Sequence, residues 1–413
     1  MRFRSYSIYA TCFLVSLLSP TLLTVYDVSK MSKIQTENKF APSTDSRTDL
    51  ALTIQCLGSI DEVVSLGDEI DALSDVIFLR TAWMVSWLKS FRSTYQRPML
   101  LACRREDKLV ALLPLVLSHS LKRGDHLVFV GHGKACSDFM TIAGATDDDV
   151  IACFSDWLMN HSDQWDRIEF HGVSGNDPAI SRLVENLNQS GCTSEEHTAL
   201  STWRLSLPES WEEFQSTLSK NSRKKFRRQQ RSLEEAGAKF LRVHDDASLR
   251  RGVEVLKELH TKRWQSLGGE GCYASEGFEE FIELGSEAHL QQDTLVLVWL
   301  EVEGEPIAAD IAFASGRGLY TYQGGISPDH LKWEPGRAIL RSQLEWAMEN
   351  GLEFIDFLRG DEPYKTRWQT EETSAVVIEV TGTGFKAGVV SKLLQAGRLI
   401  KSMMDLDSRE TGE

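Results

Sequence analysis

A glycine and a proline stand where a helix is about to begin. Pro335 and Gly336 directly precede a run of apolar residues at three- and four-residue spacing, which predicts a helix that ends at Asn350-Gly351. Its inward-facing members are Ile339, Leu340, Gln343, Leu344, Ala347 and Met348. The first backbone N–H groups of such a helix have no partner within it, and a glycine leaves them uncovered. The sequence therefore predicts a phosphate or pyrophosphate site at this helix start.

Two short strands are expected on either side of this helix, at Tyr320–Gly324 and at Phe354–Leu358. A strand, a helix and a second strand within about forty residues imply a right-handed crossover between parallel strands. The two strand ends and the helix start should then meet at one edge of a sheet.

Several side chains near that edge are candidates for a general base. Asp356 alternates with Ile355 and Phe357, so it should point to the opposite face, where burial would raise its pKa. The carboxylates Asp310, Asp361 and Glu362 and the phenol Tyr364 are further candidates. His260 lies in an amphipathic helix expected over 253–267, and a neutral imidazole titrates near physiological pH. The alternatives are a structural aspartate that caps a loop and a packed core histidine.

These motifs resemble the GNAT acyl-CoA acyltransferase superfamily. The resemblance rests on Tyr320-Thr-Tyr322, on Pro335-Gly336, and on the stretch Phe354-Ile-Asp-Phe-Leu-Arg-Gly-Asp-Glu-Pro-Tyr-Lys365, which is most similar to the acetyltransferase domain of CelD-like cellulose-biosynthesis proteins. It implies acetyl-CoA or another acyl-CoA as co-substrate and no metal. The residues it implies for coenzyme binding are Gln323, Gly324, Gly325, Ile326, Lys332, Gly336, Arg337 and Ala338. The loop departs from the superfamily pattern by having Lys332 at one end and Pro335 inside.

The chain is expected to carry this fold twice. Leu100–Leu117 and Leu295–Phe313 share the pattern strand, charged turn, strand, and each is followed by a helix and a short strand. The predicted fold class is α/β with tandem GNAT-like domains, each a mixed, mostly antiparallel sheet flanked by helices. A tandem pair also resembles the FemAB-type aminoacyltransferases. Three carboxylates at 147–149 would repel a pyrophosphate from the first copy, so the coenzyme is expected in the second.

The expected division of the chain follows from these copies. The ranges are 1–30 for an apolar leader or a mis-assigned start, 31–50 for a disordered linker, 51–205 and 206–385 for the two domains, and 386–413 for a C-terminal helix and tail. The strand at Ala375–Val380 is expected to complete the second sheet, and the C-terminal helix to pack on the second domain or to contact a membrane surface. The run Tyr6–Tyr26 has the outline of a signal peptide or an anchor, unless synthesis begins at Met31.

A strongly basic stretch opens the second domain. Seven of the twelve residues from Lys220 to Arg231 are cationic, although the chain carries a formal net charge of -15. This is either a solvated helix face or a site for an anionic acceptor, and we assign Arg227, Arg228, Asp361 and Lys365 to that acceptor. The net charge argues against a general nucleic-acid binder. The seven cysteines are scattered without metal or disulfide spacing.

The sequence thus favours an acyltransferase that moves an acyl group from acyl-CoA to an amine or hydroxyl. The acceptor would be a small amine, a sugar or an anionic envelope precursor, as in polysaccharide or cell-envelope biosynthesis. Because acyl-CoA chemistry is cytosolic, we expect a cytoplasmic protein, with membrane contact only through the N-terminal segment or the C-terminal helix. Two alternatives stay open: FemAB-type aminoacyl transfer from tRNA, and a non-catalytic GNAT-fold binding module.

Overall fold

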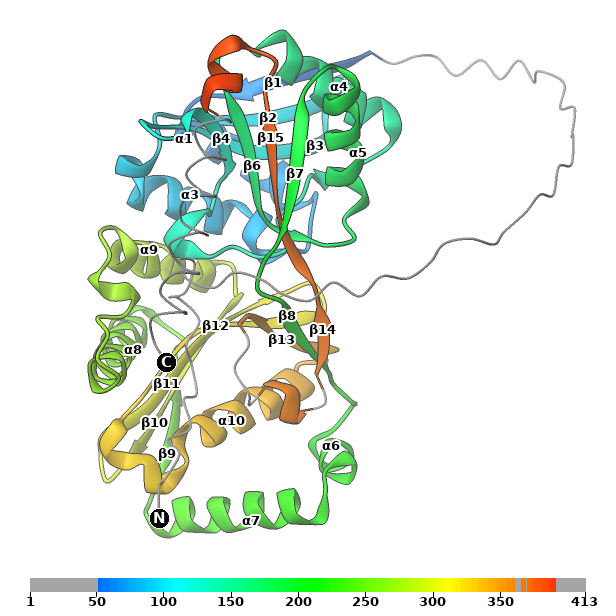
Figure 1. Ribbon diagram of the computed structural model, residues 1–413. Coiled ribbons are helices and arrows are strands. Elements are labelled where there is room, and N and C mark those ends of the chain that lie inside the picture. Colours follow the sequence, from blue (N-terminus) through cyan, green and yellow to red (C-terminus); the bar gives the residue numbers. More distant parts are fainter. Residues whose placement is uncertain (1–50, 361–364, 369, 391–413) are drawn as a thin grey trace, which may run out of the picture.

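Two β-sheets, one above the other in Figure 1, organise the molecule into two lobes. The computed structural model describes residues 51–360, 365–368 and 370–390. The first sheet has the order β1-β2-β3-β4-β6-β15-β7, with β5 beside β3, and the second has the order β14-β8-β13-β12-β11-β10-β9.

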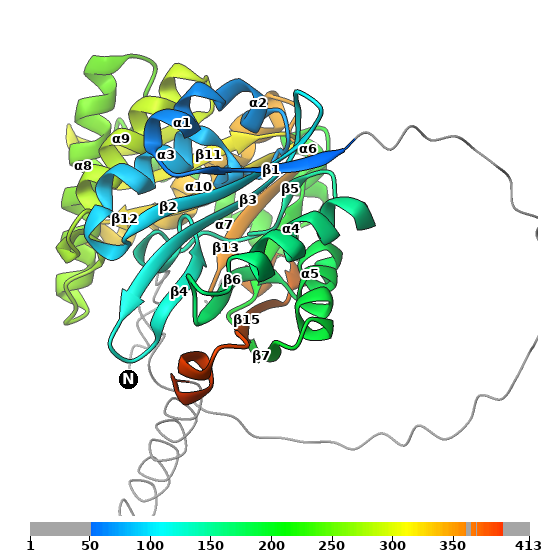
Figure 2. The same cartoon turned by 90° about the horizontal axis from the view of Figure 1, so that it is seen from above.

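The first lobe is built mainly from the N-terminal half of the chain. Its strands are β1 (Leu52–Leu57), β2 (Arg97–Arg105), β3 (Lys108–Ser120), β4 (Gly124–Phe129), β5 (Ala143–Gly144), β6 (Arg167–Ser174), β7 (Thr193–Thr198) and β15 (Ala375–Thr381). Its helices are α1 (Ile60–Ser65), α2 (Gly67–Asp71), α3 (Thr81–Ser90), α4 (Asp148–Asn160) and α5 (Pro178–Gln189). Figure 2 shows α4 and α5 together on one side of this sheet and α1, α2 and α3 on the other.

The second lobe contains the helix that was expected after Pro335. Its strands are β8 (Thr202–Ser206), β9 (Lys239–Arg242), β10 (Leu295–Val302), β11 (Glu305–Ser315), β12 (Gly318–Ile326), β13 (Phe354–Arg359) and β14 (Glu371–Thr373). Its helices are α6 (Trp211–Thr217), α7 (Lys220–Glu235), α8 (Asp246–Ser266), α9 (Phe278–Gln291) and α10 (Pro335–Glu349). Helix α10 starts with its proline in the first turn and ends before Gly351, whose φ of +69° suits glycine.

The two lobes repeat one topology, as the sequence predicted. The hairpin β2-β3, strand β4, helix α4 and strand β6 correspond to β10-β11, β12, α10 and β13. In each lobe the two strands around the helix pair in parallel over only three residues, His126–Val128 with Arg167–Glu169 and Gly318–Tyr320 with Phe354–Asp356. Each lobe therefore has the mixed, mostly antiparallel sheet of a GNAT-like fold.

The lobes exchange strands, which the sequence did not predict. Strand β15 pairs with β6 and β7 in the first sheet, so the expectation that 375–380 completes the second sheet is wrong. Strand β8, which falls almost wholly within the expected first domain, instead pairs with β13 and β14 in the second sheet. Figure 1 shows the two connections, β7 to β8 and β14 to β15, crossing side by side between the lobes. The domain limits at 205 and 206 remain a prediction, and a cut there would separate β15 from its sheet.

The hydrophobic core is continuous between the lobes. Helix α3 of the first lobe packs on α9 of the second, and Trp83 contacts the rings of Phe281 and Tyr322 edge-on, with centroids 4.8 and 5.0 Å apart. The hydroxyl of Tyr322 donates a 3.0 Å hydrogen bond to the carbonyl of Ala135. The lobes are thus joined by buried aromatic contacts as well as by the exchanged strands.

The described start of the C-terminal segment lies against the first lobe. Lys386 Nζ is 2.7 Å from Asp125 Oδ2 and 2.9 Å from Asp166 Oδ2. The expected packing of this segment on the second domain is therefore wrong for the described turn, and residues 391–413 lie outside the described part of the chain. Within the described residues, the helices are too short or too polar for any of them to cross a lipid bilayer.

Candidate functional site

The two parallel strands of the second sheet separate at the end where α10 begins. Pairing of β12 with β13 stops at Tyr320 and Asp356, whereas β12 runs on to Ile326. A bulge at Tyr322 bends β12 just past this point, because Ile311 faces Gln323 while Ala312 faces Thr321. Beyond Tyr320, no described strand pairs with β12 on its β13 side. This divergence leaves one edge of β12 uncovered by the described strands.

The start of α10 lies beside the end of β12, since Ile326 and Ala338 belong to one buried cluster. Pro335, Gly336 and Ala338 are buried, Arg337 is half-buried and Lys332 is exposed. Glu334 precedes the helix with a left-handed φ of +49°, and its carboxylate is 2.6 Å from Arg337 Nη1. Arg337 therefore neutralises the one acidic side chain at this helix start.

His260 connects helix α8 to the strand that carries the expected coenzyme contacts. Its Nδ1 is 3.1 Å from the carbonyl oxygen of Gly324, and its Nε2 is 3.2 Å from Cys272 Sγ. Burial lowers the pKa of His260 to about 4, so the ring is neutral at pH 7. A Cβ on Gly325 would lie 2.4 Å from the backbone nitrogen of His260, which shows how closely α8 covers β12. This packing fits a positioning role, and a catalytic role for His260 remains a prediction.

Asp356 is buried at the point where the strands separate. Burial raises its pKa to about 6, while Arg204 on β8 acts in the opposite direction. Its Oδ2 accepts a 3.0 Å hydrogen bond from Arg204 Nε, and its Oδ1 accepts one of 2.9 Å from the backbone of Leu358. Leu358 has a φ of +55°, which is costly for a branched side chain, so Asp356 stabilises a strained turn. Both carboxyl oxygens already have partners, and general-base action would require one of them to be released.

The turn after β13 is held by two further cations. Lys365 is buried, and its Nζ lies 3.1, 2.9 and 3.3 Å from the carbonyl oxygens of Leu358, Arg359 and Gly360. The Arg359 Nε donates a 2.7 Å hydrogen bond to Asp138 Oδ1, and its backbone N–H donates one of 3.0 Å to Oδ2. The Lys365 ammonium therefore contacts the backbone of this turn. Asp361, Glu362 and Tyr364 lie outside the described residues.

Asp310 carries a strongly perturbed carboxyl on the α10 side of the same sheet. It faces Gly324 across the β11-β12 pair, and Gln343 Nε2 of α10 donates a 2.7 Å hydrogen bond to its Oδ1. Burial raises the pKa of Asp310 to about 8, against the weaker effect of the Gln343 hydrogen bond. The side chain is therefore a neutral carboxylic acid at pH 7, packed beneath α10.

The basic helix α7 lies against the start of α10. The Gln229 side-chain amide donates to the carbonyls of Trp333 and Glu334, at 2.9 and 2.8 Å, and the Arg337 guanidinium lies 5.8 Å from the centre of the Phe226 ring. Arg227 and Arg228 are exposed on its outer face. The structure thus places these two arginines on an element that adjoins the helix start expected to bind the coenzyme.

The first lobe has a different set of residues at the corresponding positions. Asp147 caps α4 by accepting from the backbone of Val150, which leaves an acidic helix start as the sequence indicated. Glu169 takes the place of Asp356, with Arg123 at 2.7 Å and His171 at 3.3 Å. Burial alone would raise the pKa of Glu169, but His171 and Arg123 together lower it to about 2.

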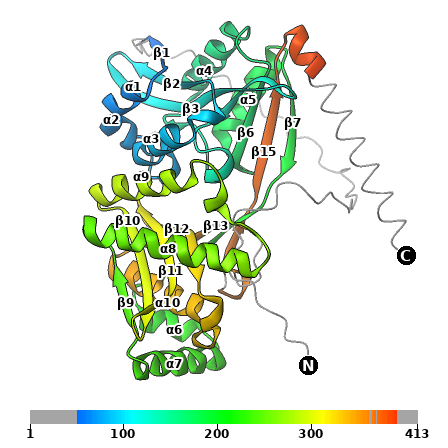
Figure 3. The same cartoon turned by 90° about the vertical axis from the view of Figure 1, so that its left-hand side faces the viewer.

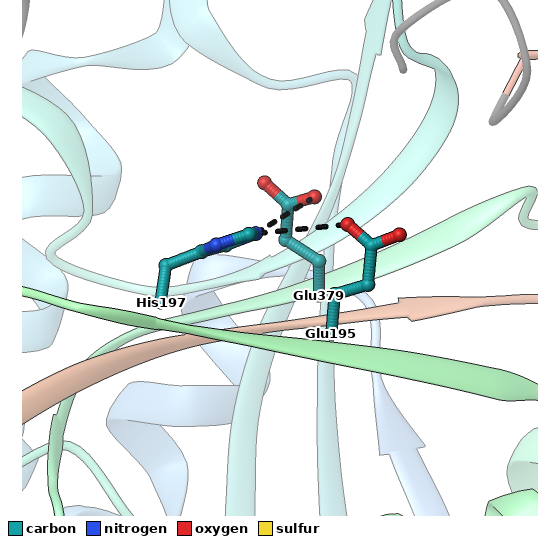
Figure 4. A group of neighbouring side chains, drawn as sticks. All are labelled: Glu195, His197 and Glu379. Carbon is teal, nitrogen blue, oxygen red and sulfur yellow. Dashed lines mark ion pairs between the residues drawn. The ribbon is translucent and has the colours of Figure 1, made fainter. Parts of the chain in front are cut away.

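Figure 4 shows a group of possible metal ligands on β7 and β15 of the first lobe: the ring of His197 points towards the carboxylates of Glu195 and Glu379. The His197 Nε2 is 3.8 and 3.9 Å from the two carboxylates. Glu379 also forms an ion pair with the buried Arg167. Because a cation of the protein already neutralises Glu379, the arrangement is accounted for as an ion-pair network.

Sequence reasoning missed Arg204, which contacts β13 at Asp356, and Asp138, which contacts its last residue, Arg359. Their partners are 152 and 221 residues away along the chain. Neither belongs to a local motif. The alternation of Trp203, Arg204 and Leu205 was the one available signal, because it marks a sheet strand with a polar side chain on one face.

Comparison with known proteins agrees with this geometry. The repeated sheet, crossover helix and diverging strands define two GNAT-like lobes. Residues 220–366, in the second lobe, match the family model of the acetyltransferase (GNAT) domain. No curated protein matches the chain in sequence.

Solved structures share the fold over both lobes. FemX is 12% identical, with a TM-score of 0.56 over 76% of this chain and 95% of that one. The C-terminal domain of a proposed lysylphosphatidylglycerol synthetase from Agrobacterium fabrum is 11% identical, with a TM-score of 0.50 over 82% of this chain and 97% of that one. A conserved protein of unknown function from Bacteroides thetaiotaomicron is 12% identical, with a TM-score of 0.50 over 80% of this chain and 100% of that one. At these identities the likeness concerns the fold alone.

Proposed function

We propose that the second lobe transfers an acyl group from an acyl-CoA to an amine or hydroxyl acceptor. The observation that carries this proposal is the separation of β12 from β13 at the end of the sheet where α10 begins. The acceptor nitrogen or oxygen attacks the thioester carbonyl and loses its proton, and coenzyme A leaves as the thiol. The match of residues 220–366 to an acetyltransferase domain supports the same reaction class.

In this proposal the donor lies along the uncovered edge of β12. The backbone from Gln323 to Ile326 would contact the pantetheine arm and polarise the thioester carbonyl, because ordered amide dipoles stabilise a developing oxyanion. The start of α10, with Gly336, Arg337 and Ala338, would receive the pyrophosphate, with Lys332 at its rim. We retain a small amine, a sugar or an envelope precursor as the acceptor class and the cytoplasm as the location.

The structure suggests a division of roles among the candidate catalytic residues. His260 holds the carbonyl of Gly324, and Asp356 holds the turn at Leu358, so both fix the backbone that binds the donor. We propose that they act mainly as positioning residues and retain Tyr364 as a candidate for the group that contacts the reacting atoms. Asp356→Asn should then lower kcat with little change in the pH profile, whereas loss of a base would change the profile itself.

The test of the donor site is Gly336→Glu, which adds a side chain and a negative charge where the pyrophosphate would approach. Calorimetric titration should show at least tenfold weaker acyl-CoA binding, about 1.4 kcal/mol. The matched control is Gly384→Glu, because a Cβ there meets no heavy atom within 4 Å and lies in the first lobe. Unchanged affinity in Gly336→Glu would reject the assignment.

Aminoacyl transfer from tRNA is a second candidate, favoured by the two-lobe similarity to FemX. This alternative predicts tight, strongly salt-dependent binding of bulk tRNA. A filter-binding assay with tRNA, beside a thiol-release assay with acyl-CoA and a panel of amino sugars, separates the two. Tight tRNA binding without thiol release would contradict our proposal, and saccharide binding without turnover of either donor would indicate a non-catalytic module.

A further inference from the structure

Helix α7 presents a strongly cationic face on a protein of opposite net charge. Six of the seven cations between Lys220 and Arg231 are exposed, and no acidic residue interrupts them before Glu234. The other face of the helix buries Phe226, Gln229 and Leu233. Because those three side chains fix the rotation of α7, the cations must face outwards.

This face lies at one extreme of the molecule. Figures 1 and 3 both show α7 as the outermost element of the second lobe, at the end away from the first lobe. No other described helix or strand is drawn beyond it in either view. An extended partner could therefore approach the full length of α7 without meeting the rest of the described structure.

Exposed apolar side chains lie on the elements that adjoin α7. Leu331 is 50% exposed on the 3-10 helix Pro328–Trp333, whose last carbonyl accepts from Gln229. Phe240 is 44% exposed on β9, the strand that follows α7 after a short turn. Cations combined with protruding apolar side chains are typical of proteins that bind the interface of an anionic bilayer.

We propose that α7, with Leu331 and Phe240, docks on an anionic phospholipid surface. Within the basic stretch the aromatic residue Phe226 is buried, and of the two exposed apolar residues Phe240 has a ring on which a base could stack while Leu331 has none. Single-stranded RNA is bound by successive stacked bases, so the patch suits a lipid surface better. The net charge of -15 repels an anionic membrane from the molecule as a whole. The cationic α7 face attracts it, so docking through α7 is oriented and weakens with salt.

The orientation has a consequence for the neighbouring helix. Because Gln229 of α7 contacts the backbone at the start of α10, a docked molecule holds that helix start close to the membrane plane. The sequence assigned Arg227 and Arg228 to an anionic acceptor, and this proposal gives them a lipid surface as partner, whose binding requires no turnover. A loss of lipid binding and a loss of acyl transfer can therefore be told apart by measuring both in each variant.

The experiment uses the full chain in a vesicle flotation assay. Vesicles of phosphatidylcholine mixed with phosphatidylglycerol should carry the protein at low ionic strength, and vesicles of phosphatidylcholine alone should not. Each cation near a charged surface contributes about fivefold to partitioning, so Arg227→Gln with Arg228→Gln should reduce binding about thirtyfold. Leu331→Ser should reduce it by a smaller factor. The control is Lys89→Gln with Lys108→Gln, which removes two exposed cations from the first lobe and should leave binding unchanged.

Three results would overturn the proposal. The first is failure of the wild-type protein to float with anionic vesicles at low salt. The second is equal flotation of the Arg227→Gln, Arg228→Gln variant, provided that circular dichroism shows it folded. The third is binding of bulk tRNA through these arginines with no binding to vesicles, which would assign the surface to a nucleic acid instead.

Discussion

Replacing Asp310 by asparagine should make the protein less sensitive to pH. Asp310 is 1% exposed, and its pKa is raised to about 8 by burial, against about 3.9 in an unfolded chain. Between these two pH values the folded state keeps the proton that the unfolded state loses. The contribution of Asp310 to the free energy of unfolding is therefore complete below about pH 4 and is lost as the pH rises through about 8.

The size of the effect follows from proton linkage. In this range each pH unit reduces the free energy of unfolding by about 1.4 kcal/mol, so the loss between about pH 5 and pH 7 approaches 3 kcal/mol. Asparagine has the same shape and can still accept the hydrogen bond from Gln343, but it does not titrate. The stability of Asp310→Asn relative to wild type should therefore rise by about 3 kcal/mol over those two units.

Urea unfolding followed by tryptophan fluorescence at several pH values measures this difference. Comparing Asp310→Asn with wild type at each pH cancels the effect on stability of the groups that titrate in both proteins. Asp329→Asn, at an exposed position, is the matched control and should run parallel to wild type. A pH-independent difference between Asp310→Asn and wild type would show that Asp310 is ionised in the folded protein, and the reasoning would fail.

Two further predictions concern the connection between the lobes. Asp138→Ala should lower the free energy of unfolding by about 2–4 kcal/mol, because it leaves the Arg359 guanidinium without its carboxylate. Differential scanning calorimetry should show a lower transition temperature, and an unchanged one would contradict this role of the ion pair. A protein truncated after Ser374 lacks β15, so its first sheet should expose β6 and β7 to aggregation. Soluble, monomeric truncated protein in size-exclusion chromatography would contradict the importance of the exchanged strand.

Local sequence patterns were sufficient to predict most of the fold. The hairpins β2-β3 and β10-β11 and the helix α10 follow from alternation and from three- and four-residue spacing, which depend on near neighbours in the chain. The repeat was visible because two such units recur in the same order. The partners of β8 and β15 were not predictable, since each strand lies between two partners of its sheet and the choice of sheet depends on tertiary packing.

The candidate site was predicted in outline but not in its contacts. The two parallel strands and the helix between them follow from the motif, and burial of Asp356 does raise its pKa as expected. That Asp356 and Lys365 contact the backbone of their own turn could not be read from the sequence. Such contacts depend on the left-handed conformation of Leu358, and leucine gives no sign of it.

The exchanged strands also impose an order of events during synthesis. The ribosome releases strands β1 to β7 before those of the second lobe, but β15, the strand that joins β6 to β7, emerges after all the strands of the second lobe. Until then the nascent first sheet has an unsatisfied edge on each side of a missing strand, a state that invites non-native pairing. The second lobe, by contrast, has all its strands once residue 373 has left the tunnel. Completion of the N-terminal lobe therefore follows completion of the C-terminal one, the reverse of the usual vectorial order.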